Sequence, residues 1–390
     1  MSKIFIKTLF KKIKGVSFIV ELWDGEILKV GEEQPEFKVI FLKELSNKDL
    51  LTSTSLALGE AYMEGNIKVE GDLYYALDRL LSAIDGFSTE REKLTDIFKT
   101  SKSKRNQKKE VCAHYDLGND FYGKWLDETM SYSCAYFKEE GDTLYEAQMN
   151  KIYHLLKKLN LKEGTTLLDI GCGWGCLLIE AAKKYKVRGL GITLSKEQYK
   201  KCKERIKEEK LEDLIDVQIM DYRDLKKSGL KFQRVVSVGM LEHVERENYQ
   251  LFFDNVDGVL DKGGVFCLHY ISSLKESQGD PWIKKYIFPG GVIPSLREII
   301  ALAGEHNFHT IDVENLRLHY KRTLREWYKN FNNSLGEMEE RYEKEFVRMW
   351  EIYLTSCAAA FNNGIVDLHQ IVFTKGVNNN LPSTRKYLYD

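Results

Sequence analysis

From residue 165 to residue 270 the chain alternates short apolar segments with longer amphipathic ones, and this alternation constrains the fold more than any other feature. The alternation predicts buried strands separated by helices. We expect strands at 166–170, 187–192, 215–219, 234–238 and 265–269, with helices that begin at Cys176, Ser195 and Glu247. Such an order is typical of an α/β fold, in which helices cover both faces of a parallel sheet and the ligand binds at the carboxyl ends of the strands.

A glycine-rich loop directly follows the first expected strand. It contains Gly171, Gly173 and Gly175, each separated from the next by one residue. Because glycine has no Cβ, this spacing lets the backbone approach a ligand closely. A nicotinamide-binding loop would need glycine or alanine where this chain has Cys176, so a hydride-transfer enzyme is disfavoured.

With Asp169 before it, the loop has the pattern D-x-G-x-G-x-G and resembles motif I of S-adenosylmethionine-dependent methyltransferases with a Rossmann-like fold. The resemblance implies that the loop admits the methionine and ribose portions of this cofactor. Many such enzymes have an acidic residue for the ribose at the end of the second strand, whereas this chain has Thr193 there and Gln198 a turn later. Hydroxyl and amide groups would therefore bind the ribose. The segment expected to flank the adenine ring consists of Asp221, Tyr222 and Arg223.

Several further strings resemble cyclopropane fatty acid synthase, a bacterial enzyme that methylenates double bonds in membrane phospholipids. In the family's order, they are HYDLGNDFY at 114–122, YSCAYF at 132–137, DYRD at 221–224, VGMLEHV at 238–244, YIFPGG at 286–291 and YLTSCA at 353–358. A weaker match, LGEAYMEG at 58–65, lies in the N-terminal region. The related mycolic acid cyclopropane synthases usually lack that region, so the phospholipid enzyme is the better match.

The resemblance implies a reaction in which an alkene attacks the sulfonium methyl group and becomes a carbocation. A proton must then leave the transferred carbon so that the ring can close, which requires cation stabilisation and a nearby base. The family is understood to hold a bicarbonate ion as this base. The ligands that the resemblance implies are the side chains of Glu242, His269 and Tyr320 and backbone groups at Cys134 and Ile271. Taken alone, His269 and Tyr320 could equally be packed core residues, and His243 is expected only to cap or pack.

Three further residues belong to the predicted site. Tyr132 and Ser133, from the YSCAYF string, are expected beside the cofactor. Cys357 is treated as an active-site residue by family convention. No covalent enzyme intermediate is needed when the alkene is the nucleophile, and the three alanines that follow Cys357 favour a packing role on a helix.

The sequence pattern of the N-terminal third differs from that of the parallel-sheet region and predicts a separate domain. We expect a small α+β lipid-binding domain over 1–88, a basic linker over 89–110 and the catalytic domain over 111–390, with a helical lid or wall near 323–361. Ile6, Phe10 and Ile13 recur at helical spacing with lysines on the opposite side. This helix could lie on anionic lipid, or it could dock on its own domain with a solvated lysine face.

Charge and cysteine content exclude other classes. Lys plus Arg total 58 against 59 Asp plus Glu, so the chain has no basic footprint for nucleic acid. It lacks the ~20 consecutive apolar residues of a spanning helix. Its seven cysteines form no C-x-x-C pair, which speaks against a zinc ribbon and favours reduced cytoplasmic thiols.

We therefore expect a cytoplasmic enzyme that attaches peripherally to the inner face of the membrane and uses S-adenosylmethionine and bicarbonate, but no metal. Family precedent implies a homodimer. Two alternatives remain open. The same carbocation could give a methyl-branched or hydroxylated chain, or the acceptor could be a small molecule. The chain could also be a non-catalytic membrane-binding module that has kept the fold.

Overall fold

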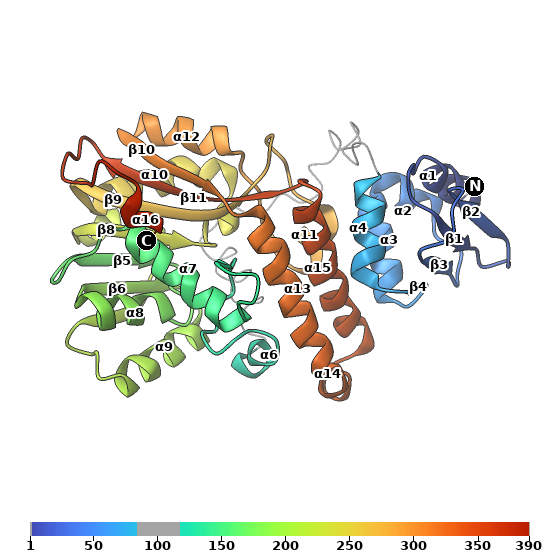
Figure 1. Ribbon diagram of the computed structural model, residues 1–390, viewed down its shortest axis with the longest axis horizontal. Coiled ribbons are helices and arrows are strands. Elements are labelled where there is room, and N and C mark those ends of the chain that lie inside the picture. The colour runs from blue at the N-terminus through green and yellow to red at the C-terminus, as the bar shows by residue number, and fades with distance from the viewer. Residues whose placement is uncertain (1, 84–117, 390) are drawn as a thin grey trace. The chain divides into compact units, whose positions relative to one another are not determined.

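The computed structural model describes residues 2–83 and 118–389 (Figure 1). The predicted basic linker lies outside the described residues. The chain divides into two compact units that are discontinuous in sequence. The first joins the N-terminal region to residues 279–289 and 324–365, and the second contains the rest of the described chain. The linear domain bounds expected from the sequence remain a prediction.

The second unit contains a seven-stranded sheet in the order β10-β11-β9-β8-β5-β6-β7. Its strands are β5 (Thr166–Ile170), β6 (Arg188–Thr193), β7 (Ile215–Ile219), β8 (Phe232–Val238), β9 (Leu260–Ser272), β10 (Phe308–Asn315) and β11 (Asp367–Lys375). The five strands from β9 to β7 are mutually parallel, whereas β11 pairs antiparallel with both β9 and β10. The predicted α/β fold with its parallel sheet is confirmed, and the antiparallel strands β10 and β11 are an addition that was not predicted.

The helices of this unit are α6 (Asn119–Gly123), α7 (Leu144–Lys158), α8 (Cys176–Tyr185), α9 (Lys196–Glu208), α10 (Tyr249–Val259), α12 (Leu296–Glu305) and α16 (Lys386–Tyr389). Capping residues determine where several of these helices begin. Thr143 and Glu146 form a capping box at α7, and the Ser195 hydroxyl accepts a hydrogen bond from Gln198 N at α9. The helix expected from Glu247 begins at Tyr249, after a short 3₁₀ turn.

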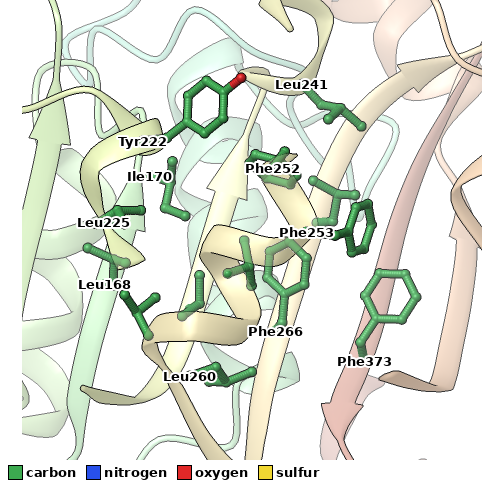
Figure 2. Close-up of a cluster of buried hydrophobic side chains, with 14 of the residues drawn as sticks. Leu168, Ile170, Tyr222, Leu225, Leu241, Phe252, Phe253, Leu260, Phe266 and Phe373 are labelled. Carbon is green, nitrogen blue, oxygen red and sulfur yellow. The ribbon is translucent and has the colours of Figure 1, made fainter. Parts of the chain in front are cut away.

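Two apolar clusters cover the two faces of the sheet. Even-numbered positions of β5 and β9, such as Leu168 and Phe266, pack with Phe252 and Phe253 of α10 (Figure 2). The odd-numbered Leu167 and its neighbours pack instead against α7, α8 and α9. Because a strand alternates its side chains between faces, Asp169 and His269 belong to the same face as α7.

The strand order indicates where in the sheet a ligand would bind. The chain continues from β5 to β6 and β7 on one side, and then crosses to β8 and β9 on the other. This reversal between β5 and β8 is the topological switch point, where the carboxyl ends of parallel strands leave room for a ligand. The glycine loop follows β5 at that point.

The first unit contains a four-stranded sheet in the order β2-β1-β3-β4. Its strands are β1 (Phe18–Glu21), β2 (Ile27–Val30), β3 (Lys38–Phe41) and β4 (Ile67–Glu70). Its helices are α1 (Ser2–Lys11), α2 (Asn47–Thr52), α3 (Thr54–Met63), α4 (Leu73–Ser82), α11 (Pro281–Tyr286), α14 (Leu335–Arg341) and α15 (Lys344–Asn362). Helix α13 (Arg317–Asn333) runs through the boundary between the units. The predicted α+β character of the N-terminal region and the helical run near its predicted place are thus observed.

Helix α1 packs its apolar side into its own domain. Ile6 and Phe10 are buried in a cluster with Phe18 of β1, and the Phe10 and Phe18 ring centroids are 5.6 Å apart. On the polar side, Lys3 and Lys7 form ion pairs with acidic residues of the same domain. The helix is thus docked on its own domain, and contact of its lysine side with anionic lipid stays a prediction.

Candidate active site

A pocket opens at the carboxyl ends of the parallel strands and contains every residue that was predicted to bind the cofactor. Those lining residues are Tyr132, Ser133, Asp169, Gly171, Gly173, Gly175, Thr193, Gln198, Asp221, Tyr222 and Arg223. They come from the segment before α7, the glycine loop and the ends of β6 and β7. The fold therefore brings together residues that lie up to 91 positions apart in the sequence, although their role as cofactor ligands stays a prediction.

The three loop positions require glycine for different structural reasons. All three have positive φ, at 83° for Gly171, 54° for Gly173 and 82° for Gly175. A Cβ at Gly175 would overlap Cys202 Sγ, and one at Gly171 would lie 2.9 Å from Met240 Cγ. A Cβ at Gly173 would meet no protein atom within 4 Å. Packing thus excludes side chains at two positions, and Gly173 alone leaves open space beside the pocket.

Polar groups at the ends of β6 and β7 hold one another in place. The Thr193 hydroxyl donates to Gln198 Oε1 at 2.8 Å, so the amide nitrogen is the group through which Gln198 can bind a ribose hydroxyl. Arg223 donates to the Asp221 carboxylate through its backbone N, Nε and Nη2, at 3.0, 2.9 and 2.6 Å. An internal ion pair therefore holds the Asp221–Arg223 segment, which was predicted to flank the adenine ring.

The segment before α7 forms another wall of the pocket. Gln148 Nε2 donates to Ser133 O at 2.9 Å, and Lys151 Nζ donates to Ser133 Oγ at 3.0 Å. Lys151 lines the pocket and is only 3% exposed, although it was not among the predicted site residues. The sequence feature that could have indicated its burial is its helical spacing: Lys151 lies on the same side of α7 as Gln148 and Leu155, which are both buried.

Asp169 and His243 also line the pocket. Burial raises the pKa of Asp169 to about 7, an effect that the positive charge of Lys151 opposes. Burial lowers the pKa of His243 to about 4, so its imidazole is neutral near pH 7. His243 was expected only to cap or pack, and its place in the pocket wall makes a ligand contact geometrically accessible.

Glu242 lies on the 3₁₀ turn Leu241–His243 that follows β8. Its Oε1 accepts a hydrogen bond from the backbone N of Ile271 at 2.6 Å, so the structure brings two of the predicted bicarbonate ligands together. Its Oε2 is buried without a hydrogen-bond partner among the described residues. Burial raises the pKa of Glu242 to about 7. Because the Ile271 N–H is engaged by Glu242, an anion at this point would have to be bound by other donors.

His269 supplies such a donor. The side chain is buried on β9, and Gln370 Nε2 lies 3.0 Å from its Nδ1. If this amide nitrogen donates, the neutral imidazole carries its proton on Nε2, which has no partner within the described chain. Burial lowers the pKa of His269 well below its ordinary value, with Lys151 and Lys158 adding to the effect.

Cys134 and Tyr320 are linked through the start of α13. The Cys134 thiol is fully buried and contacts the carbonyl oxygens of Ala135 and Leu316, at 3.2 and 3.8 Å. Tyr320 is also buried, one helical turn after Leu316, whose O accepts from Tyr320 N at 3.1 Å. Burial raises the pKa of the Cys134 thiol, which keeps it protonated and unsuited to act as a nucleophile.

Cys357 is on α15, in the first unit, and does not line the pocket. Burial raises the pKa of its thiol to about 12. The packing role expected from its sequence context is consistent with this position, and a catalytic role stays untested.

Comparison with known proteins adds independent information. Residues 102–371 match the family described as mycolic acid cyclopropane synthetase, and residues 5–92 match a domain family of unknown function. The chain is 40% identical to the cyclopropane-fatty-acyl-phospholipid synthase of Escherichia coli K12, over 87% of this chain and 88% of that protein. It is also 40% identical to a probable fatty acid methyltransferase of Pseudomonas putida, over 95% of each chain.

Solved structures agree with the fold. The cyclopropane synthase MmaA2 from Mycobacterium tuberculosis matches with a TM-score of 0.65 and 33% identity, covering 69% of this chain and 98% of that one. The mycolic acid cyclopropane synthase CmaA1, complexed with SAH and CTAB, matches with a TM-score of 0.64 and 35% identity over the same shares.

Proposed function

The chain belongs to the mycolic acid cyclopropane synthetase family, and from this premise we propose that it acts on membrane phospholipids. It transfers a methylene group from S-adenosylmethionine to cis double bonds of their acyl chains and forms cyclopropane rings, with a bound bicarbonate as the base. The enzyme class follows the Escherichia coli relative, which is named a cyclopropane-fatty-acyl-phospholipid synthase and matches along most of both chains.

The pocket fits the proposed cofactor. Its glycine loop admits a ligand against the backbone, Gln198 offers an amide to the ribose, and the Asp221–Arg223 segment flanks the adenine position. S-adenosylmethionine, when bound, supplies an electrophilic methyl group on its sulfonium. The chain itself has to orient that group, exclude water and hold the base that accepts the proton.

The observation that carries the bicarbonate proposal is a pair of buried polar atoms without partners in the described chain, Glu242 Oε2 and His269 Nε2. Glu242 follows β8, and His269 lies on the adjacent strand β9, where it pairs with Val238 at the end of β8. Leaving such an atom unpaired costs ~1–3 kcal/mol. Bicarbonate has both a proton to donate and oxygens to accept, so it could satisfy the carboxylate and the imidazole together. Tyr320 and the backbone near Cys134 would complete its binding.

We further propose that the N-terminal domain binds lipid, that the protein attaches peripherally to the inner face of the membrane, and that it is a cytoplasmic homodimer. In the part of the chain that the structure describes, no helix is long and apolar enough to cross a bilayer. Since Lys3 and Lys7 are already ion-paired, attraction to anionic lipid would come from lysines such as Lys11 and Lys14. Exposed apolar side chains of the same domain, including Ile4 and Leu51, could enter the interface.

The test is mass spectrometry of fatty acids from cells that express the protein. Formation of a ring adds CH₂, a gain of about 14 mass units on monounsaturated chains, whereas a saturated methyl branch adds about 16. Purified enzyme should also lose activity when bicarbonate is removed from the buffer. Glu242→Gln should keep cofactor binding but slow turnover by ~10²-fold, the scale of positioned proton transfer. Unmodified fatty acids in cells that contain the folded protein would refute the proposal.

A second product class has a specific observation in its favour. The Pseudomonas putida relative, which matches over 95% of this chain, is named a probable fatty acid methyltransferase. The same carbocation could instead lose a proton from a neighbouring carbon and give a methyl-branched alkene. That product also gains CH₂, so mild hydrogenation before mass spectrometry separates the candidates, because the branched alkene takes up H₂ and the cyclopropane does not.

A further inference from the structure

Lys151 is a buried cation in the wall of the cofactor pocket. Its Nζ has one hydrogen-bond acceptor within the described chain, Ser133 Oγ at 3.0 Å, although an ammonium group has three protons to donate. A lysine charge that is 97% buried is costly unless an anion pairs with it. No carboxylate of the described residues lies within ion-pair distance of this ammonium.

The charged and titratable groups around Lys151 do not supply that anion directly. Asp127 and Asp169 act on it electrostatically and favour its protonated form. Asp127 is occupied with Thr129, whose backbone N and hydroxyl both donate to it at 3.0 Å. Burial lowers the pKa of Lys151 against these effects. The protein thus surrounds the lysine with negative potential but leaves its remaining protons without a close acceptor.

The position of Lys151 within the pocket indicates which ligand atoms it could reach. Gln198 and the Asp221–Arg223 segment mark the adenosine end, at the β6 and β7 side of the glycine loop. Lys151 and Ser133 come instead from α7 and the segment before it, and Lys151 is close enough to Asp169, near the end of β5, for their charges to interact. In a cofactor whose adenosine lies against Gln198 and the Asp221–Arg223 segment, the amino acid portion, with its carboxylate and ammonium group, would lie toward Lys151.

We propose that Lys151 Nζ, together with the Ser133 hydroxyl, binds the carboxylate of the amino acid end of S-adenosylmethionine. This assignment rests on the proposed function. The ligand carboxylate pairs with the buried ammonium, and Asp169 at the same end is of the right sign for the ligand's own ammonium group. The wall of the pocket is thereby matched to a zwitterion at one end and to a neutral nucleoside at the other.

A purely structural role explains the lysine less well. The segment before α7 is already held by Gln148, a neutral side chain, through Ser131 O and Ser133 O. One more bond to a serine hydroxyl could be made by another neutral residue without the cost of a buried charge. A binding role and a structural role also predict different ligand selectivity, which makes them separable.

The experiment compares two ligands by calorimetry: S-adenosylhomocysteine, and the same molecule without its carboxylate. Wild-type protein should prefer the complete ligand by on the order of 10-fold to 100-fold, the scale of a hydrogen bond to a charged group. Lys151→Met, which keeps length and removes the charge, should lose most of that preference while binding the decarboxylated ligand as the wild type does. Lys151→Arg should keep part of the preference.

Lys158→Met is the matched control. Lys158 is a second buried lysine on α7, but it is paired with Glu314 and Asp312 and does not line the pocket. Its loss should leave the ligand preference unchanged. Equal weakening of both ligands in Lys151→Met, or an unchanged preference, would overturn the assignment. If Lys151→Met does not fold, a wild type that binds both ligands equally would overturn it. A wild type that binds neither ligand would instead refute the proposed function.

Discussion

Replacement of Gly173 by alanine isolates the ligand's need for space from the backbone's need for glycine. Gly173 and Gly164 both have left-handed backbones, with φ of 54° and 77°, and no atom lies within 4 Å of an added Cβ at either position. Alanine in this conformation costs ~1–2 kcal/mol relative to glycine. We therefore expect Gly173→Ala and Gly164→Ala to lower the free energy of unfolding by similar amounts.

The two variants should differ in cofactor binding. Gly173 lines the pocket, whereas Gly164 is exposed at the opposite end of β5. A methyl group at Gly173 would occupy space that the ligand requires, so the dissociation constant for S-adenosylhomocysteine should rise at least about tenfold, or ~1.4 kcal/mol. Gly175→Ala provides a third case, because its Cβ would overlap Cys202 Sγ and should destabilise the fold more than either.

Chemical denaturation gives the stabilities of these variants, and calorimetric titration gives their ligand affinities. Stability and ligand affinity should separate, because Gly164→Ala loses stability alone and Gly173→Ala loses both. Wild-type affinity in a folded Gly173→Ala protein would refute the assignment of the loop as a ligand contact. Equal affinity loss in Gly164→Ala would show that backbone strain, and not ligand space, controls binding.

Three further outcomes are expected. The folded-state pKa of Glu242 is raised to about 7 from an ordinary 4.5, so between these pH values the folded state holds a proton that the unfolded state has lost, and stability falls as pH rises. Glu242→Gln lacks this dependence. Its free energy of unfolding, measured by denaturant titration, should therefore rise relative to that of the wild type from pH 5 to pH 8, by up to about 3 kcal/mol. A difference between the two proteins that does not change with pH would contradict a buried, protonated carboxyl group. The double variant Lys11→Gln, Lys14→Gln should bind anionic vesicles more weakly in flotation, by up to ~1 kcal/mol of binding free energy per charge. The effect per charge should exceed that of Lys3→Gln, because Lys3 is already ion-paired. Equal effects would count against a patch centred on Lys11 and Lys14. Cys357→Ala should retain near wild-type kcat because its thiol, with a pKa of about 12, is not a nucleophile, and a loss of kcat without a loss of stability would restore a catalytic role.

The sequence by itself determined the parallel core and the location of the glycine loop. Strands at 166–170 and 215–219 were predicted with the bounds that the structure shows, because strands buried on both faces are continuous apolar segments. The Ser195 cap and the left-handed glycines are equally local, since they depend on the conformational preferences of a few neighbouring residues. The clustering of the predicted cofactor residues then followed from the rule that ligands bind at the switch point of a parallel sheet.

The tertiary structure alone decided which polar groups meet. Glu242 reaches Ile271 across adjacent strands, and Cys134 contacts Leu316 from 182 positions away. The antiparallel pairing of β11 with β9 and β10 likewise joins segments whose own patterns are not distinctive. Lys151 looked like one more lysine on a helix until docking of α7 on the sheet buried it in the pocket. Periodicity records only the spacing within one element, whereas the burial and pairing of a charge depend on which element packs against it.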